Sequence, residues 1–106
     1  MTFEVRRAIR ANHPSLAGHF PDQPLVPGVL ILDEVLAALR DRRKDCQFAA
    51  IPAVKFLRPL EPERRFTIRF SASAEDASNV NFCCHIEDRV IAEGKLEVYC
   101  GTKATP

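Results

Sequence analysis

Apolar and polar residues alternate in the second half of the chain, and this pattern predicts antiparallel β-strands. The alternation is clearest at 65–73 and 79–87, and weaker versions occur at 3–11, 49–57 and 90–100. Short polar or proline-containing turns separate the last four stretches. One face of each strand is therefore expected to be buried. The residues expected to point inward in the two clearest strands are Phe66, Ile68, Phe70, Val80, Phe82, Cys84 and Ile86.

A helix is predicted between the first and second strands. Four of the eight prolines lie at positions 14–27, where they fix φ and remove backbone donors, so this stretch is expected to be irregular. Pro27 is well placed as the first helical residue. From position 29 to 39 only Asp33 and Glu34 interrupt an apolar run, which is typical of a helix buried nearly all round. The basic run at 40–44 suits the end of that helix.

One helix and about five antiparallel strands predict an α+β architecture in a single domain, residues 1–106. The sheet needs one face covered, and if it curls round the helix both elements bury their apolar surfaces. The outer strands are then left to pair with another copy of the chain. We see no repeat, linker or low-complexity segment that would divide the chain.

Composition limits the possible partners and cofactors. Fifteen basic and fourteen acidic residues give a net charge of +1, which does not favour nucleic acid or a membrane surface. No signal start or membrane-length apolar span is present, so we expect a cytoplasmic protein whose four cysteines are free thiols filling the core. No cysteine or histidine pair has metal-ligand spacing, and no glycine-rich phosphate loop occurs. We therefore expect neither metal nor cofactor.

Candidate chemistry gathers around the start of the predicted helix. Gly28 leaves the backbone amide uncovered there, and such a helix start can hold an oxyanion or a polarised carbonyl. His19 lies just upstream, and Asp33 lies on the helix, where a buried carboxylate is costly and needs a reason. A histidine, a bare helix start and a carboxylate thus fall within fifteen residues.

Several motifs resemble those of the β-hydroxyacyl-acyl-carrier-protein dehydratases of fatty-acid synthesis. They are GHFP at 18–21, PLVPGV at 24–29 with Leu-Asp at 32–33, VKFxRP at 54–59, and the final hairpin at 90–98. This resemblance covers most of the chain from about Asn12 onward and implies the hotdog fold, a curled antiparallel sheet wrapped round one long central helix. Asp22 stands where the family commonly has glycine, and members usually carry more chain before GHFP.

The resemblance implies catalytic roles for His19 and Asp33. His19 would be the base that removes a proton from C2 of a 3-hydroxyacyl thioester, and its reference pKa of about 6.5 suits that task. Asp33, at the family's spacing of fourteen positions, would protonate the departing 3-hydroxyl from the neighbouring subunit. The family has glutamate here in its dehydratase-only branch and aspartate in the branch that also isomerises the double bond. Glu34 would replace Asp33 only if the register shifted by one.

Four further residues receive binding roles from the resemblance. The Gly28 amide would hydrogen-bond the thioester oxygen. The Leu25 carbonyl would accept a hydrogen bond from the ring of His19 and so fix its tautomer, and Phe20 and Val29 would form an apolar wall beside the thioester. Structural alternatives stay open: His19 tying down its loop, Gly28 permitting a turn, Asp33 bonded into an interface, and Phe20 and Val29 as core. Exposed arginines at 58, 64 and 65 either contact an acidic carrier protein or are only solvated.

The function expected from these residues is dehydration of a 3-hydroxyacyl thioester, bound to an acyl carrier protein, to the trans-2-enoyl thioester. The pathway would be fatty-acid-like or polyene synthesis, and the enzyme a homodimer or a larger assembly of dimers with shared active sites. One alternative is a hotdog acyl thioesterase. Another is a non-catalytic hotdog subunit that binds acyl carriers or pairs with an active partner.

Overall fold

The computed structural model describes residues 2–10, 25–72 and 78–100, and it contains every element that the sequence pattern predicts. The ends of the strands differ from the predicted ones by up to four residues. The elements in chain order are β1 (Thr2–Arg7), α1 (Gly28–Arg42), β2 (Cys46–Phe56), β3 (Phe66–Ser71), β4 (Asn79–Ile86) and β5 (Arg89–Cys100).

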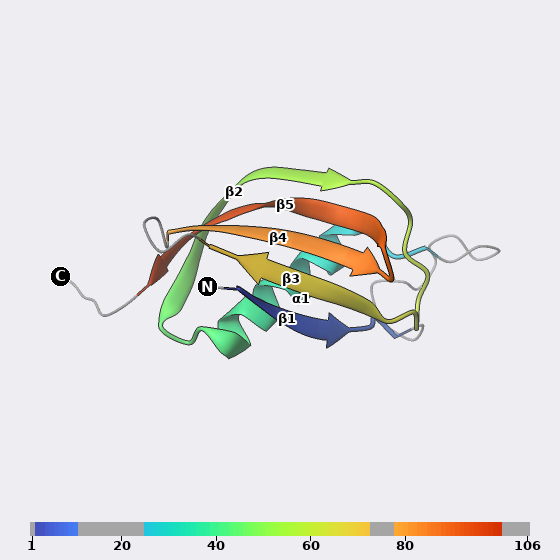
Figure 1. Ribbon diagram of the computed structural model, residues 1–106, viewed down its shortest axis with the longest axis horizontal. Coiled ribbons are helices and arrows are strands. Elements are labelled where there is room, and N and C mark those ends of the chain that lie inside the picture. Colours follow the sequence, from blue (N-terminus) through green and yellow to red (C-terminus); the bar gives the residue numbers. More distant parts are fainter. Residues whose placement is uncertain (1, 11–24, 73–77, 101–106) are drawn as a thin grey trace.

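The five strands form one antiparallel sheet in the order β1-β3-β4-β5-β2. Figure 1 shows this sheet curved, with α1 lying against one face of it. The α+β prediction of a curled sheet around one helix is thereby confirmed. Among the described strands, β1 and β2 each have a neighbour on one side only.

The core lies between α1 and the inner face of the sheet. Of the seven side chains predicted to point inward, six are buried and Ile86 is partly buried against them. Phe3 of β1 stacks on Phe70, its register partner in β3, with ring centroids 4.8 Å apart. The guanidinium carbon of Arg42 lies 4.6 Å from the centre of the Phe3 ring, so the last turn of α1 covers this aromatic pair.

Helix α1 begins one residue later than predicted. Pro27 has φ −60° and ψ 144°, so it is the N-cap residue in extended conformation and Gly28 is the first helical residue. No side chain caps this end. At the other end Arg40 and Arg42 occupy the last turn, as predicted, and the Arg43 amide donates to the Leu39 carbonyl at 2.8 Å.

The prediction of a helix buried nearly all round is wrong for the single chain. The buried residues of α1 lie on one stripe, because the sheet covers only one side of the helix. On the opposite side Val29 is 61% exposed and Asp33 is also exposed. The apolar composition of α1 therefore exceeds what its own sheet can cover. The buried side chains are Leu30, Ile31, Val35, Ala38 and Leu39.

The expectation of four free thiols is also wrong. Cys46, the first residue of β2, is disulfide-bonded, and its register partner on β5 is Cys100. Cys83 and Cys84 are free and lie on opposite faces of β4, with Cys84 fully buried in the core. Burial raises the pKa of the Cys84 thiol to about 12, and the neighbouring Cys83 adds to this shift.

Strand β2 is irregular along its length. Its pairing with β5 shifts register between Phe48 and Ala50 and again between Ala50 and Ala53, and Pro52 lies in the second of these intervals. Proline lacks the amide hydrogen that a regular ladder requires, and bulges of this kind are common in edge strands.

No helix in the described ranges has the length and apolar character needed to cross a membrane.

Candidate active site

A cleft of about 460 Å³ lies between the start of α1 and the end of β2. It contains two of the predicted substrate-binding residues, Gly28 and Val29, together with Arg58 from the segment that follows β2. Because its walls are mostly apolar, the cleft suits the reactive end of an acyl chain. The lining residues are Val26, Gly28, Val29, Ile31, Phe56, Leu57, Arg58, Pro59 and Leu60.

Backbone hydrogen bonds hold the two sides of this cleft together. The Val26 amide donates to the Leu60 carbonyl at 2.8 Å, and the Leu57 amide donates to the Ile91 carbonyl at 2.8 Å. The Leu60 side chain is 1% exposed and anchors the segment in the core. The entry to α1 is thus fixed against the connection between β2 and β3, although both segments are irregular.

The start of α1 carries a partial positive charge that no acidic side chain of its own first turn compensates. Its first turn contains no acidic side chain, and the Leu30 amide is bonded to the Pro27 carbonyl at 3.0 Å. Within the described residues, the amides of Gly28 and Val29 have no acceptor. Two free amides at a helix start favour an oxygen that gains negative charge.

Gly28 has a packing role as well. A Cβ atom at this position would lie 2.7 Å from Cζ of the Phe56 ring, closer than side-chain carbons approach. The residue must therefore be small because the aromatic ring packs against the helix start. This contact supports the alternative that glycine is needed here for packing, and it does not exclude the amide's role.

Asp33 and Val29 lie on the outward face of α1, one turn apart. Asp33 lies five positions after Gly28, which is about 7–8 Å along the helix axis. The neighbouring Glu34 is turned toward β1, where its carboxylate lies 3.8 Å from the guanidinium of Arg7. The two adjacent carboxylates therefore face different surroundings, and Asp33 is the one on the uncovered side of the helix.

The structure brings some predicted site residues together and leaves others untested. Gly28 and Val29 line one cleft, and Asp33 lies one turn further along the same helix. Leu25 is partly buried just before the helix. His19 and Phe20 lie outside the described residues, so the proposed contact between Leu25 and the histidine stays a prediction.

Sequence reasoning assigned no site role to the aromatic and aliphatic side chains at the end of β2. Phe56 is 48% exposed and Leu57 is 50% exposed, and both line the cleft. Phe56 was noted only as part of the VKFxRP motif. The available sequence signal was the position of Phe56 within that motif, because its exposure and its place beside the helix start are known only from the structure.

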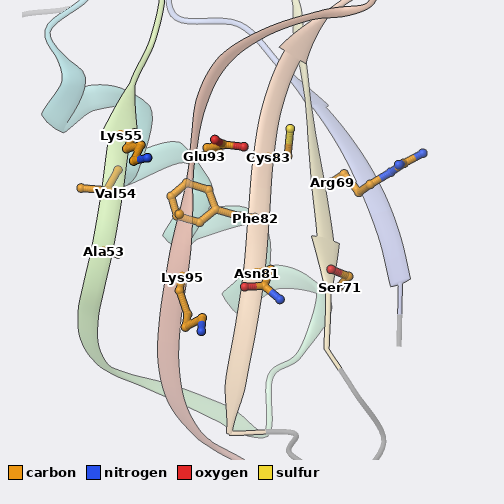
Figure 2. Close-up of a pocket in the computed structure, with 11 residues that line it drawn as sticks. Ala53, Val54, Lys55, Arg69, Ser71, Asn81, Phe82, Cys83, Glu93 and Lys95 are labelled. Atoms are coloured by element: carbon orange, nitrogen blue, oxygen red, sulfur yellow. The ribbon is translucent and has the colours of Figure 1, made fainter.

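A second hollow, of about 420 Å³, lies on the sheet face away from α1 (Figure 2). Lys55, Glu93, Cys83 and Arg69 form one row across β2, β5, β4 and β3, because each is the register partner of the next. Burial raises the pKa of the Cys83 thiol, Glu93 raises it further, and Arg69 opposes both effects. None of the predicted site residues lines this hollow.

Possible metal ligands do not gather in groups of three or more within residues 2–10, 25–72 and 78–100.

Comparison with known proteins agrees with this picture. The ApeI-like family model, described as ApeI dehydratase, matches residues 1–95. The chain is 32% identical to the 3-hydroxyacyl-acyl-carrier-protein dehydratase FabZ of Geobacter metallireducens, with 92% of this chain and 69% of the relative covered. It is 31% identical to the FabZ dehydratase of Chlamydia trachomatis, with 87% and 68% covered.

Among solved structures, a chain of the dehydratase heterocomplex ApeI:P from Xenorhabdus doucetiae superposes with a TM-score of 0.78 at 25% identity, covering 94% of this chain and 88% of that one. The predicted hotdog fold is thereby confirmed. A family model that matches nearly the whole chain and relatives above 30% identity lead to one conclusion: the chain belongs to the ApeI-like dehydratase family.

Proposed function

We propose that this protein removes water from a 3-hydroxyacyl thioester whose reactive end binds in the helix-start cleft that holds Gly28 and Val29. The single observation that carries the proposal is that the amides of Gly28 and Val29 have no acceptor among the described residues, while both residues line an apolar cleft. The relatives named FabZ act on 3-hydroxyacyl groups carried by an acyl carrier protein, and a carrier-linked substrate is proposed here too.

The proposed chemistry divides into three tasks. The Gly28 amide hydrogen-bonds the thioester oxygen as negative charge develops on it. His19 removes the proton from C2, and Asp33 protonates the 3-hydroxyl group, which leaves as water. The carbon–oxygen bond at C3 breaks as the double bond between C2 and C3 forms, so the reaction needs no oxidant or reductant.

A second copy, or a related hotdog chain, is proposed to complete the site. The supporting features are the edge of β2 that pairs with no other described strand, and the exposed apolar side chains on β2, just after it and at the start of α1. Asp33 lies on the uncovered face of α1, so a carboxylate from one chain would meet a histidine from the other. The exposed apolar residues are Val29, Phe48, Phe56 and Leu57.

The first test is formation of the enoyl thioester, followed by its absorbance, for wild type, His19→Ala and Asp33→Asn. Both variants should lose at least about a hundredfold in kcat, because each removes a positioned acid or base. Glu34→Gln is the matched control, since it neutralises the adjacent carboxylate that faces Arg7. Full activity in His19→Ala or Asp33→Asn would remove that residue from the mechanism. Release of free thiol in place of enoyl product would identify a thioesterase.

A mixing experiment tests whether the site is shared. Neither His19→Ala nor Asp33→Asn is active alone, but a mixed dimer keeps one site with both groups intact. Random exchange of subunits should restore about a quarter of wild-type activity, since half of the dimers are mixed and half of their sites are complete. If no activity returns although subunits exchange, the two residues act within one chain or not at all.

A further inference from the structure

A groove of about 320 Å³ lies on the outer face of the sheet, where β1 ends and β3 begins. Three of its residues lie side by side on adjacent strands, because Arg6 of β1 pairs with Thr67 of β3, and Thr67 pairs with His85 of β4. Arg65, the residue before β3, lies beside this row, and the buried Phe66 forms part of the floor. The lining residues are Arg6, Arg65, Phe66, Thr67, His85, Ile86 and Glu87.

The two arginines of this groove have no charge partner in the part of the chain that the structure describes. Both are exposed, and no carboxylate oxygen of a described residue lies within 4.0 Å of either guanidinium. Arg69 lies on β3, four positions after Arg65. Unlike the two groove arginines, it has a charge partner, because its Nε lies 3.0 Å from a carboxylate oxygen of Glu4. Arg6 and Arg65 thus offer unpaired guanidinium groups, whose planar donors match carboxylates.

The remaining polar groups of the groove are held in place by the β4–β5 hairpin. Nδ1 of His85 lies 2.9 Å from the Glu87 carbonyl oxygen, which can only accept, so this nitrogen donates and the ring is fixed. Thr67 adds a partly buried hydroxyl group. Glu87 is the one acidic residue that lines the groove, against two arginines, so the balance of charge is positive.

The groove lies at the same end of the molecule as the helix-start cleft. Figure 1 shows the end of β1, the end of β2, the start of β3 and the start of α1 at this end. Arg58 lines the cleft and Arg65 lines the groove, and the six residues 59–64 connect the two. A protein that delivers a thioester to the cleft from this end of the molecule would have the groove beside it.

We infer that the groove formed by Arg6, Arg65, Thr67 and His85 is the docking site for acidic side chains of the carrier protein that presents the thioester. This inference rests on the proposed function and names the surface that its partner uses. Unpaired arginines at the rim raise the rate of encounter with an acidic partner and fix its orientation, while the chemistry in the cleft is unaffected.

The experiment compares one 3-hydroxyacyl group carried on an acidic acyl carrier protein, on pantetheine and on coenzyme A. Arg65→Glu reverses a groove charge, and Arg69→Glu is the matched control because it changes the net charge equally on the same strand face. In Arg65→Glu, kcat/KM for the carrier-linked substrate should fall roughly tenfold, mainly through KM, with the pantetheine thioester unchanged. Arg69→Glu should change kcat/KM for the carrier-linked substrate by less than about threefold. The double variant Arg6→Glu/Arg65→Glu should lower kcat/KM for the carrier-linked substrate further than Arg65→Glu alone.

Three results would overturn the inference. The first is an unchanged kcat/KM for the carrier-linked substrate in Arg6→Glu/Arg65→Glu. The second is an equal loss of kcat/KM in Arg65→Glu and Arg69→Glu. The third is a loss of kcat/KM with the coenzyme A thioester but not with the carrier-linked one, which would indicate a phosphate site. Anisotropy of a labelled carrier gives a readout that does not need catalysis. If wild type dehydrates none of the thioesters, the proposed function fails, and loss of carrier binding in the double variant still decides the docking site.

Discussion

Replacing Gly28 by alanine separates the two roles that this residue can have at the start of α1. The new Cβ would lie 2.7 Å from the Phe56 ring, about 0.7 Å inside the 3.4 Å at which ordinary van der Waals contact begins. Overpacking of this kind costs about 1–3 kcal/mol, and the higher helix propensity of alanine returns at most about 1 kcal/mol. With the full gain subtracted, Gly28→Ala should lower the free energy of unfolding by about 0–2 kcal/mol, and the packing cost itself is isolated by removing the ring.

The test is a double-mutant cycle with Phe56→Ala, measured by urea unfolding. Without the ring, Gly28→Ala meets no obstacle and should be neutral or stabilising by a few tenths of a kcal/mol, so the coupling energy should be about 1 kcal/mol or more. If Gly28→Ala costs the same with and without Phe56, the packing argument is wrong. The dehydration rate of the double variant then reports the amide's role, because alanine keeps the N–H group.

Three further predictions concern stability. Gly94→Ala should lower the free energy of unfolding, measured in urea, by more than about 2 kcal/mol. Its Cβ would lie 2.5 Å from the backbone oxygen of Ala53, and a backbone atom cannot rotate away. A decrease below about 0.5 kcal/mol would contradict this prediction. The thiol pKa of Cys84 is raised to about 12, so the folded state holds a proton that the unfolded state releases near pH 8.5, and the free energy of unfolding should fall as pH rises from about 8.5 to 12. Cys84→Ala, although less stable at every pH, should show a shallower fall, and an identical slope would count against the assignment. Arg69→Ala should change stability by less than about 1 kcal/mol, because its ion pair with Glu4 is exposed; a thermal shift that implied more would disqualify Arg69 as a control.

The sheet was predictable because its signal is local. Alternation at Phe66, Ile68 and Phe70 identifies both the strand and its buried face, and the structure confirms it. The strand order was not predictable, because pairing β1 with β3 and β5 with β2 depends on contacts between distant segments.

The helix shows where composition misleads. Val29 is apolar, so the sequence predicted its burial, but burial depends on what lies opposite, and the sheet covers only one side of the helix. Similarly, Gly28 was selected for its uncovered amide, whereas the Phe56 ring above it is known only from the structure. The sequence shows which residues could take part in catalysis or binding. It does not show which side chains pack against them and limit what they can do.

The interruption of β2 by Pro52 bears on how the protein behaves at high concentration. A free strand edge is a template on which further chains can add without limit, as in fibre growth. Pro52 withdraws one donor from the strand, and the two register shifts disturb the spacing of the others. Open-ended stacking on this edge is therefore disfavoured, because a regular stack of identical edges would leave carbonyl groups without donors at every layer.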